Sequence, residues 1–90
     1  MISPMIKEAV REIAREKYGE APVFMSRSGD DIPGLRVEKG DLVVYVRAAP
    51  VPGDAVAIDN NGKVGFERWD PGSGKRIKGV VVTAIRELGR

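Results

Sequence analysis

Residues 55–86 read AVAIDNNGKVGFERWDPGSGKRIKGVVVTAIR, and the pattern of this stretch decides the fold class. Two runs of strand-forming residues, 55–59 and 64–69, flank the segment Asn60-Asn61-Gly62. This segment is typical of a tight hairpin turn, because Asn and Gly tolerate a positive φ. After a second turn over residues 70–74, a third run covers residues 77–86 and is apolar at almost every position from 80 to 85. We expect this last strand to be buried on both faces, and Gly79 near its start predicts a bulge or a close backbone approach.

Two more strands are expected upstream of this stretch. Residues 42–47 are rich in β-branched and aromatic residues and predict a strong strand, while residues 23–26 predict a short one. The segment between them, 27–41, is rich in glycine and acidic residues and predicts a loop with at most one turn of structure. Five short strands separated by turn residues indicate a mainly β fold with coiled β-sheets, of the β-clip or small-barrel type.

An amphipathic helix is expected over residues 4–18. Ser3 can cap it, Pro4 suits the first helical position, and Gly19 is a typical C-terminal stop. Apolar residues recur at helical spacing on one face, namely Ile6, Val10, Ile13 and Ala14. We expect this face to pack on its own domain, with a partner surface as the alternative. The 90 residues then make a single domain, with the helix in 1–20 and the β part in 21–90.

Composition narrows the possible chemistry. The chain contains no cysteine and no histidine, which excludes disulfides, a Ser-His-Asp triad and thiolate or imidazole metal ligands. Its 15 basic and 13 acidic residues leave a net charge of +2, without the strong basic excess of a dedicated nucleic-acid binder. No run approaches the roughly 20 apolar residues of a membrane span, and no apolar signal segment begins the chain. We therefore expect no cofactor, no membrane contact and a cytoplasmic location.

Five segments of residues 23–86 match, in order and spacing, a pattern found in one family. They are Gly29-Asp30-Asp31-Ile32, Gly40-Asp41-Leu42-Val43-Val44, Pro52-Gly53-Asp54-Ala55-Val56-Ala57, Phe66-Glu67-Arg68-Trp69 and Ile77-Lys78-Gly79-Val80-Val81-Val82. In this respect the chain resembles the LexA-like self-cleaving repressors and the signal peptidases. The resemblance implies their coiled β-sheets and a cleft that receives an extended segment.

The catalytic positions of that family are altered in this chain. In the family a serine after Gly-Asp is the nucleophile, and a buried lysine in the hairpin arm is its base. The matched spacing places Asp31 at the serine position and Glu67, directly before Arg68, at the lysine position. A carboxylate cannot replace the neutral amine that accepts the serine proton, so the resemblance implies an inactive peptidase. The candidate cleft around these two degenerate positions comprises Gly29, Asp30, Ile32 and Arg68.

Asp31 and Glu67 would face one another if the match holds. Two carboxylates at close range raise one pKa or attract a cation. The plainer interpretation is that Arg36 or Arg68 neutralises them, or that both point to solvent. The acids beside turns are expected to be turn and cap residues, namely Asp41, Asp54, Asp59 and Asp70. The aromatic residues Phe24, Tyr45, Phe66 and Trp69 are expected in the core or on a hairpin face.

Three functions follow as hypotheses. The leading one is a non-catalytic protein-interaction or dimerisation module, regulatory and of phage or mobile-element origin, whose partner is a peptide segment or a second copy. The alternative is a nucleic-acid-binding β-barrel that uses a basic hairpin and one aromatic residue, namely Trp69, Lys75, Arg76 and Lys78. The third is hydrolase chemistry built on Asp31 and Glu67.

Overall fold

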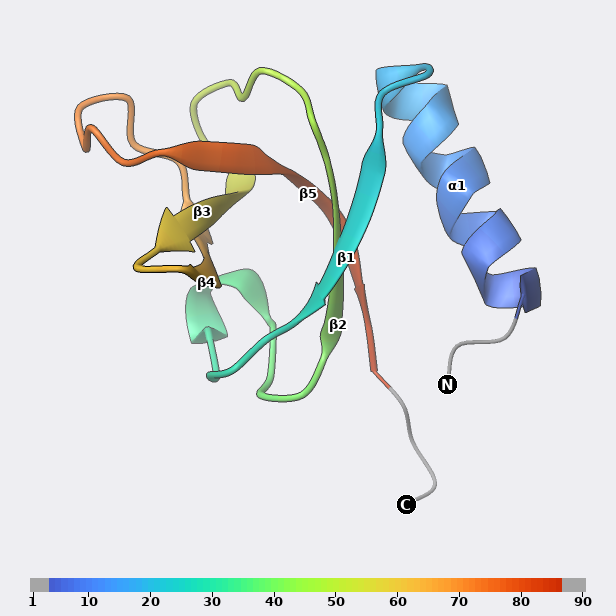
Figure 1. The fold of residues 1–90 in the computed structure, drawn as a ribbon, viewed down its shortest axis with the longest axis horizontal. Helices are drawn as coiled ribbons and strands as arrows, with labels where there is room; N and C mark the ends of the chain where they lie inside the picture. Colours follow the sequence, from blue (N-terminus) through green and yellow to red (C-terminus); the bar gives the residue numbers. More distant parts are fainter. Residues whose placement is uncertain (1–3, 87–90) are drawn as a thin grey trace.

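A computed structural model of the protein describes residues 4–86, which form one helix and one five-stranded antiparallel sheet. Figure 1 shows the helix beside a strongly curved sheet. The elements are α1 (Pro4–Tyr18), β1 (Val23–Arg27), a 3₁₀ turn η1 (Pro33–Leu35), β2 (Leu42–Val46), β3 (Ala55–Asn60), β4 (Lys63–Arg68) and β5 (Ile77–Ile85). Each helix or strand expected from the sequence is present, and its ends lie within one residue of the expected ones. The loop between β1 and β2 contains the single turn η1, as predicted. The cap proposed for Ser3 lies outside the described residues.

The sheet is open, with strand order β1-β2-β5-β3-β4. The mainly β class with one N-terminal helix is therefore confirmed, whereas closure into a small barrel is wrong for this sheet. Closure would require β1 and β4 to pair with each other, but they stand at opposite ends of the order. Among residues 4–86, the structure contains no helix with the length and apolar character needed to cross a bilayer.

Strand β5 joins the two halves of the sheet and bends between them. Its C-terminal half pairs with β2 and its N-terminal half with β3, and the register shifts once in each pairing. These shifts leave Lys78 and Val82 without an opposite residue, which is the geometry of a β-bulge. Figure 1 shows the resulting curve, in which β5 crosses the upper part of the view and then turns downward along β2.

Gly79 permits this bend. A β-carbon at Gly79 would collide with the carbonyl oxygen of Val46 and would lie 2.9 Å from Cδ2 of Tyr45. The close backbone approach expected at Gly79 is therefore confirmed, and the bulge that was the alternative prediction occurs at the neighbouring Lys78.

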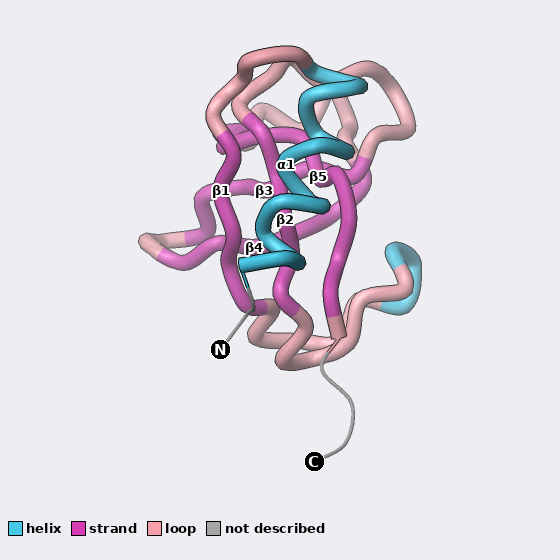
Figure 2. The backbone as a smooth tube through the Cα atoms, turned by 90° about the vertical axis from the view of Figure 1, so that its right-hand side faces the viewer, coloured by secondary structure: helices cyan, strands magenta, loops and turns pink. Residues whose placement is uncertain are grey.

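Helix α1 covers one face of the sheet, over β2 and β5 (Figure 2). Val10 and Ala14 are buried on the inner face of the helix, and Ala14 packs against Val46 and Val80. Ile13, which the helical spacing also assigned to this face, is instead 49% exposed. Among the described side chains, the helix thus packs on its own domain through Val10 and Ala14, and the side chain of Ile6 lies outside the described part of the structure.

The opposite face of the sheet carries the second core cluster. Val43, Tyr45, Ala57 and Phe66 meet there, and Val37 closes the cluster from the loop that contains η1. Because the helix covers one face and this loop the other, all five residues of β2 are buried. Burial on both faces was predicted for β5, and this was wrong: most of β5 is half-buried, and β2 holds the doubly covered position.

Candidate functional site

A small cavity lies where the loop after β1 meets the β3–β4 hairpin. Its volume is about 170 Å³. Gly29, Asp30 and Ile32 line it from the loop, and Phe66 and Glu67 line it from β4. Three of the four residues expected to surround the cleft are therefore brought together with Glu67, one of the two positions matched to catalytic residues of the resembled family. We call this space the loop–hairpin cavity.

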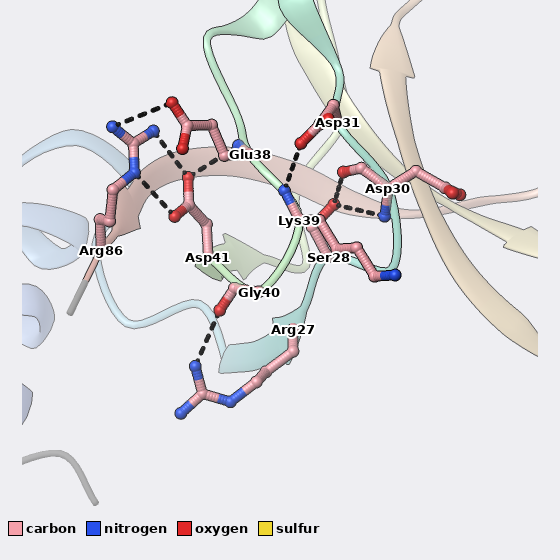
Figure 3. A network of polar contacts seen from close by, with 9 residues as sticks. All are labelled: Arg27, Ser28, Asp30, Asp31, Glu38, Lys39, Gly40, Asp41 and Arg86. Atoms are coloured by element: carbon pink, nitrogen blue, oxygen red, sulfur yellow. Dashed lines mark hydrogen bonds and ion pairs between the residues drawn. The ribbon is translucent and has the colours of Figure 1, made fainter. Parts of the chain in front are cut away.

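Asp31 and Glu67 each bind a different partner. The Oδ1 atom of Asp31 accepts a hydrogen bond of 2.8 Å from the backbone N–H of Lys39, which ties together the two ends of the loop (Figure 3). The Oε1 atom of Glu67 lies 2.9 Å from Nζ of Lys75. The cation that neutralises Glu67 is thus Lys75, rather than Arg36 or Arg68 as the sequence suggested.

Arg68 fastens the loop to the end of the sheet. Its guanidinium donates one hydrogen bond to the carbonyl of Gly53 at 2.9 Å and another to the carbonyl of Gly34 at 3.3 Å. Gly34 belongs to η1 and Gly53 to the turn before β3, so one exposed side chain links three segments. Arg68 therefore holds η1 against the turn before β3 and does not line the loop–hairpin cavity.

Ser28 also lines this cavity. It is buried, and its hydroxyl donates a 2.6 Å hydrogen bond to the carbonyl of Asp30. That bond closes the turn which presents Asp30 and Gly29 to the cavity. In residues 4–86, no group of three or more Asp or Glu side chains is arranged to hold a metal ion.

Asp41 is the most completely buried charged residue of the region, with 3% of its surface exposed. Arg86 holds both of its carboxylate oxygens at 3.0 Å, and the N–H of Glu38 donates to Oδ2 at 2.9 Å (Figure 3). The hydrogen bonds from Arg86 and Glu38 keep the pKa of Asp41 below its ordinary value of 3.8, although burial acts in the opposite direction. This pair anchors the end of β5 to the start of β2.

The prediction that the acids beside turns are turn and cap residues is confirmed. Like Asp41, each of the other three accepts a hydrogen bond from a backbone N–H two or three residues away. They are Asp54, which binds Val51; Asp59, which binds Gly62; and Asp70, which binds Gly72.

A second cavity has a volume of about 420 Å³. Two residues of the expected nucleic-acid patch, Arg76 and Lys78, line it. The other two are placed elsewhere, since Lys75 pairs with Glu67 and the half-buried Trp69 donates its backbone N–H to the carbonyl of Asp54. The remaining lining residues come from β1, the end of β2 and the start of β5, namely Phe24, Tyr45, Arg47 and Ile77. We call this space the aromatic–basic pocket.

Comparison of the chain with protein-family models, with curated proteins and with solved structures finds no match. Function must therefore be inferred from the two cavities and from the edges of the sheet.

Sequence reasoning missed the aromatic–basic pocket because its members lie far apart along the chain. The expected strand assignments contain part of the signal. Tyr45 and Arg47 are two residues apart, so they point to the same face of a strand. Phe24 joins Tyr45 and Arg47 only because it pairs with Tyr45, and this pairing depends on the register of β1 on β2.

Proposed function

We propose that the protein is a non-catalytic interaction module, with the coiled sheet of a LexA-like or signal-peptidase-like domain, that binds an extended peptide segment along β4. The observation that carries the proposal is that β4 is an edge strand and that its residues also line the loop–hairpin cavity. An edge strand offers unpaired backbone groups to an added strand, and an adjacent pocket selects one of its side chains.

The hydrogen-bond alternation of the hairpin identifies the free groups of β4. Trp69 donates its N–H to the carbonyl of Asp54, so position 69 faces β3. In an antiparallel pair, successive residues direct their backbone groups alternately toward and away from the partner strand. Val64, Phe66 and Arg68 therefore direct their N–H and C=O groups away from β3, where a peptide strand can pair with them.

The loop–hairpin cavity supplies specificity in this proposal. Its apolar walls include Ile32, Ile58 and Val64, and Asp30 and Glu67 lie among its polar lining. We infer that it accepts one aliphatic side chain of the bound strand. Because the carboxylate of Glu67 already pairs with Lys75, the polar lining does not require a basic side chain on the ligand.

The state of the two degenerate positions supports a role without peptidase chemistry. Asp31 holds the N–H of Lys39, and Glu67 holds Lys75, so both carboxylates serve as hydrogen-bond acceptors that order the loop and the hairpin. A serine and a neutral lysine would be required at these positions for the reaction of the resembled family. The simplest extended partner is β4 of a second copy, which would give a symmetric dimer with a regulatory role.

Selection of short random peptides displayed on phage tests this proposal. A selected peptide is expected to bind Val64→Pro roughly tenfold more weakly than the unaltered protein, since proline removes an outward N–H and obstructs strand addition. Val64→Pro leaves the pairing with β3 in place, because position 64 faces outward; circular dichroism checks that it folds.

Met25→Pro is the matched control on the other edge of the sheet. Arg47 donates to the carbonyl of Pro22, so position 22 faces β2 and position 25 faces outward from β1. Peptide affinity is expected to stay within twofold in this variant. Loss of affinity in Met25→Pro but not in Val64→Pro would contradict the assignment to β4.

A further inference from the structure

The aromatic–basic pocket has a floor of two stacked rings. The centroids of Phe24 and Tyr45 are 5.6 Å apart, with an angle of 25° between the ring planes. Tyr45 is buried in the inner core cluster, whereas Phe24 is 36% exposed. The core therefore holds Tyr45 in place, and Tyr45 in turn supports an aromatic ring that remains open to solvent.

All charged residues that line this pocket are basic. They are Arg47, Arg76 and Lys78, and all three are exposed. None of the three forms an ion pair within residues 4–86, unlike Lys75, which is engaged by Glu67. Arg47 already lies over an aromatic face, with its guanidinium carbon 5.6 Å from the Phe24 ring centroid.

The bend of β5 assembles these cations beside the rings. The tight approach at Gly79 brings the start of β5 against Tyr45 and Val46. Lys78 is the extra residue of the bulge opposite β3, and the carbonyl of the preceding Arg76 accepts a hydrogen bond from Asp59 at 3.1 Å. The backbone that carries both cations is therefore fixed to the sheet.

We propose that the aromatic–basic pocket binds single-stranded nucleic acid. A base inserts between the ring of Phe24 and the guanidinium of Arg47, which moves outward from its place over that ring, and Arg76 and Lys78 contact the neighbouring phosphates. An exposed aromatic ring surrounded by unpaired cations is the arrangement that single strands require, because each base has a free face and each linkage one negative charge. A duplex is excluded from this mode, since its bases are stacked on one another.

Fluorescence anisotropy with labelled oligo(dT) and oligo(U) tests the proposal on the full chain. Both probes are expected to bind, because the stacking face and the phosphates are common to DNA and RNA, with a dissociation constant on the order of 10–100 µM at about 50 mM salt. Two phosphate contacts predict that the logarithm of the association constant falls with the logarithm of salt concentration with a slope of about −1.4.

Substitutions separate stacking from charge. Phe24→Leu is expected to weaken binding by about tenfold, whereas Phe24→Tyr, which keeps the ring, retains it. Lys78→Gln should reduce the magnitude of the salt slope by about 0.7. Lys63→Gln is the matched control, since it removes the same charge from an exposed position in the β3–β4 hairpin. Its affinity is expected to stay within twofold of the unaltered protein.

Several results would overturn the proposal. They are the absence of binding at low salt, equal affinity of Phe24→Leu and the unaltered protein, equal losses in Lys63→Gln and Lys78→Gln, and equally effective competition by duplex DNA. Equally effective competition by polyglutamate would identify the pocket as a site for acidic peptides and would overturn it as well. Thermal unfolding of each variant by circular dichroism establishes that the comparison is made between folded proteins.

Discussion

Replacement of Gly79 by alanine is the sharpest test of the fold, because one methyl group should disturb the contact on which the curved sheet depends. That methyl group would collide with the carbonyl oxygen of Val46 and would lie 2.9 Å from Tyr45. Neither neighbour can move freely, since Val46 and Tyr45 belong to the fully buried strand β2. The φ of Gly79 is outside the left-handed region, so the expected cost comes from the contact alone.

The magnitude follows from two opposing terms. Overpacking of a rigid site costs about 1–3 kcal/mol, while loss of glycine from the unfolded chain offsets about 0.4–1 kcal/mol of this, so the net destabilisation is about 1.3 kcal/mol. A domain of this size has roughly 3–5 kcal/mol of stability, so Gly79→Ala should remove about a third of it. The melting temperature should then fall by about 5–10 °C.

Urea unfolding followed by the fluorescence of Trp69, the single tryptophan, measures this change. Gly34→Ala is the matched control, because a β-carbon there meets nothing within 4 Å and its φ is also outside the left-handed region. Its free energy of unfolding should change by less than about 0.5 kcal/mol. If Gly79→Ala proved as stable as this control, the proposed role of the close approach in shaping the sheet would be refuted.

Three further predictions concern charges and the helix. Because folding lowers the pKa of Asp41, the stability contributed by its ionised carboxylate is complete above pH 4. This stability is lost as the pH falls from 3.8, the ordinary pKa of the group, through its lower pKa in the folded protein. Asp41→Asn should therefore lower the free energy of unfolding at pH 7 by about 1–3 kcal/mol and flatten its pH dependence below pH 4, as measured by urea unfolding across pH. Ala14→Asp buries an unpaired charge under the helix and should lower the free energy of unfolding by about 2–4 kcal/mol, as measured by thermal unfolding. Ile13→Asp, at the neighbouring exposed position, should lower it by less than about 0.5 kcal/mol. Similar losses in the two variants would argue against the observed inner face of the helix. The side chains of Glu67 and Lys75 are 32% and 51% exposed, so water screens their ion pair. A double-mutant cycle of Glu67→Gln and Lys75→Gln should therefore give a coupling free energy below about 1 kcal/mol. A larger value would mean that this pair is more rigid than described.

Local features of the chain could be predicted because they depend on near neighbours. Asn61-Gly62 forms the expected hairpin turn with both residues at positive φ, which these residue types permit at little cost. The side chains of the turn acids reach only two or three residues along the backbone. Helical spacing likewise placed α1, and runs of strand-forming residues between turn residues placed the five strands, since each of these signals lies within its own segment.

The candidate site was predictable only in part. One cavity is lined by four residues of the predicted cleft, namely Gly29, Asp30, Ile32 and Glu67. The prediction used the spacing of the matched segments, and these segments form the loop after β1 and strand β4. The partner of Glu67 was assigned incorrectly, since Lys75 returns to it across a turn whose path the sequence does not specify. This ion pair follows from the exact course of the backbone, since Arg68 and Lys63 lie nearer to Glu67 in sequence than Lys75 does.

The sequence by itself thus determined the elements, their turns, the special position of Gly79 and the absence of cysteine and histidine chemistry. Tertiary structure alone decided that β5 lies between β2 and β3, that β2 is covered on both faces, and that Phe24, Arg47 and Lys78 share one pocket. The physical reason is that strand order and register are set by the packing of the whole sheet. A bulge of one residue changes which distant side chains become neighbours, while each local pattern stays the same.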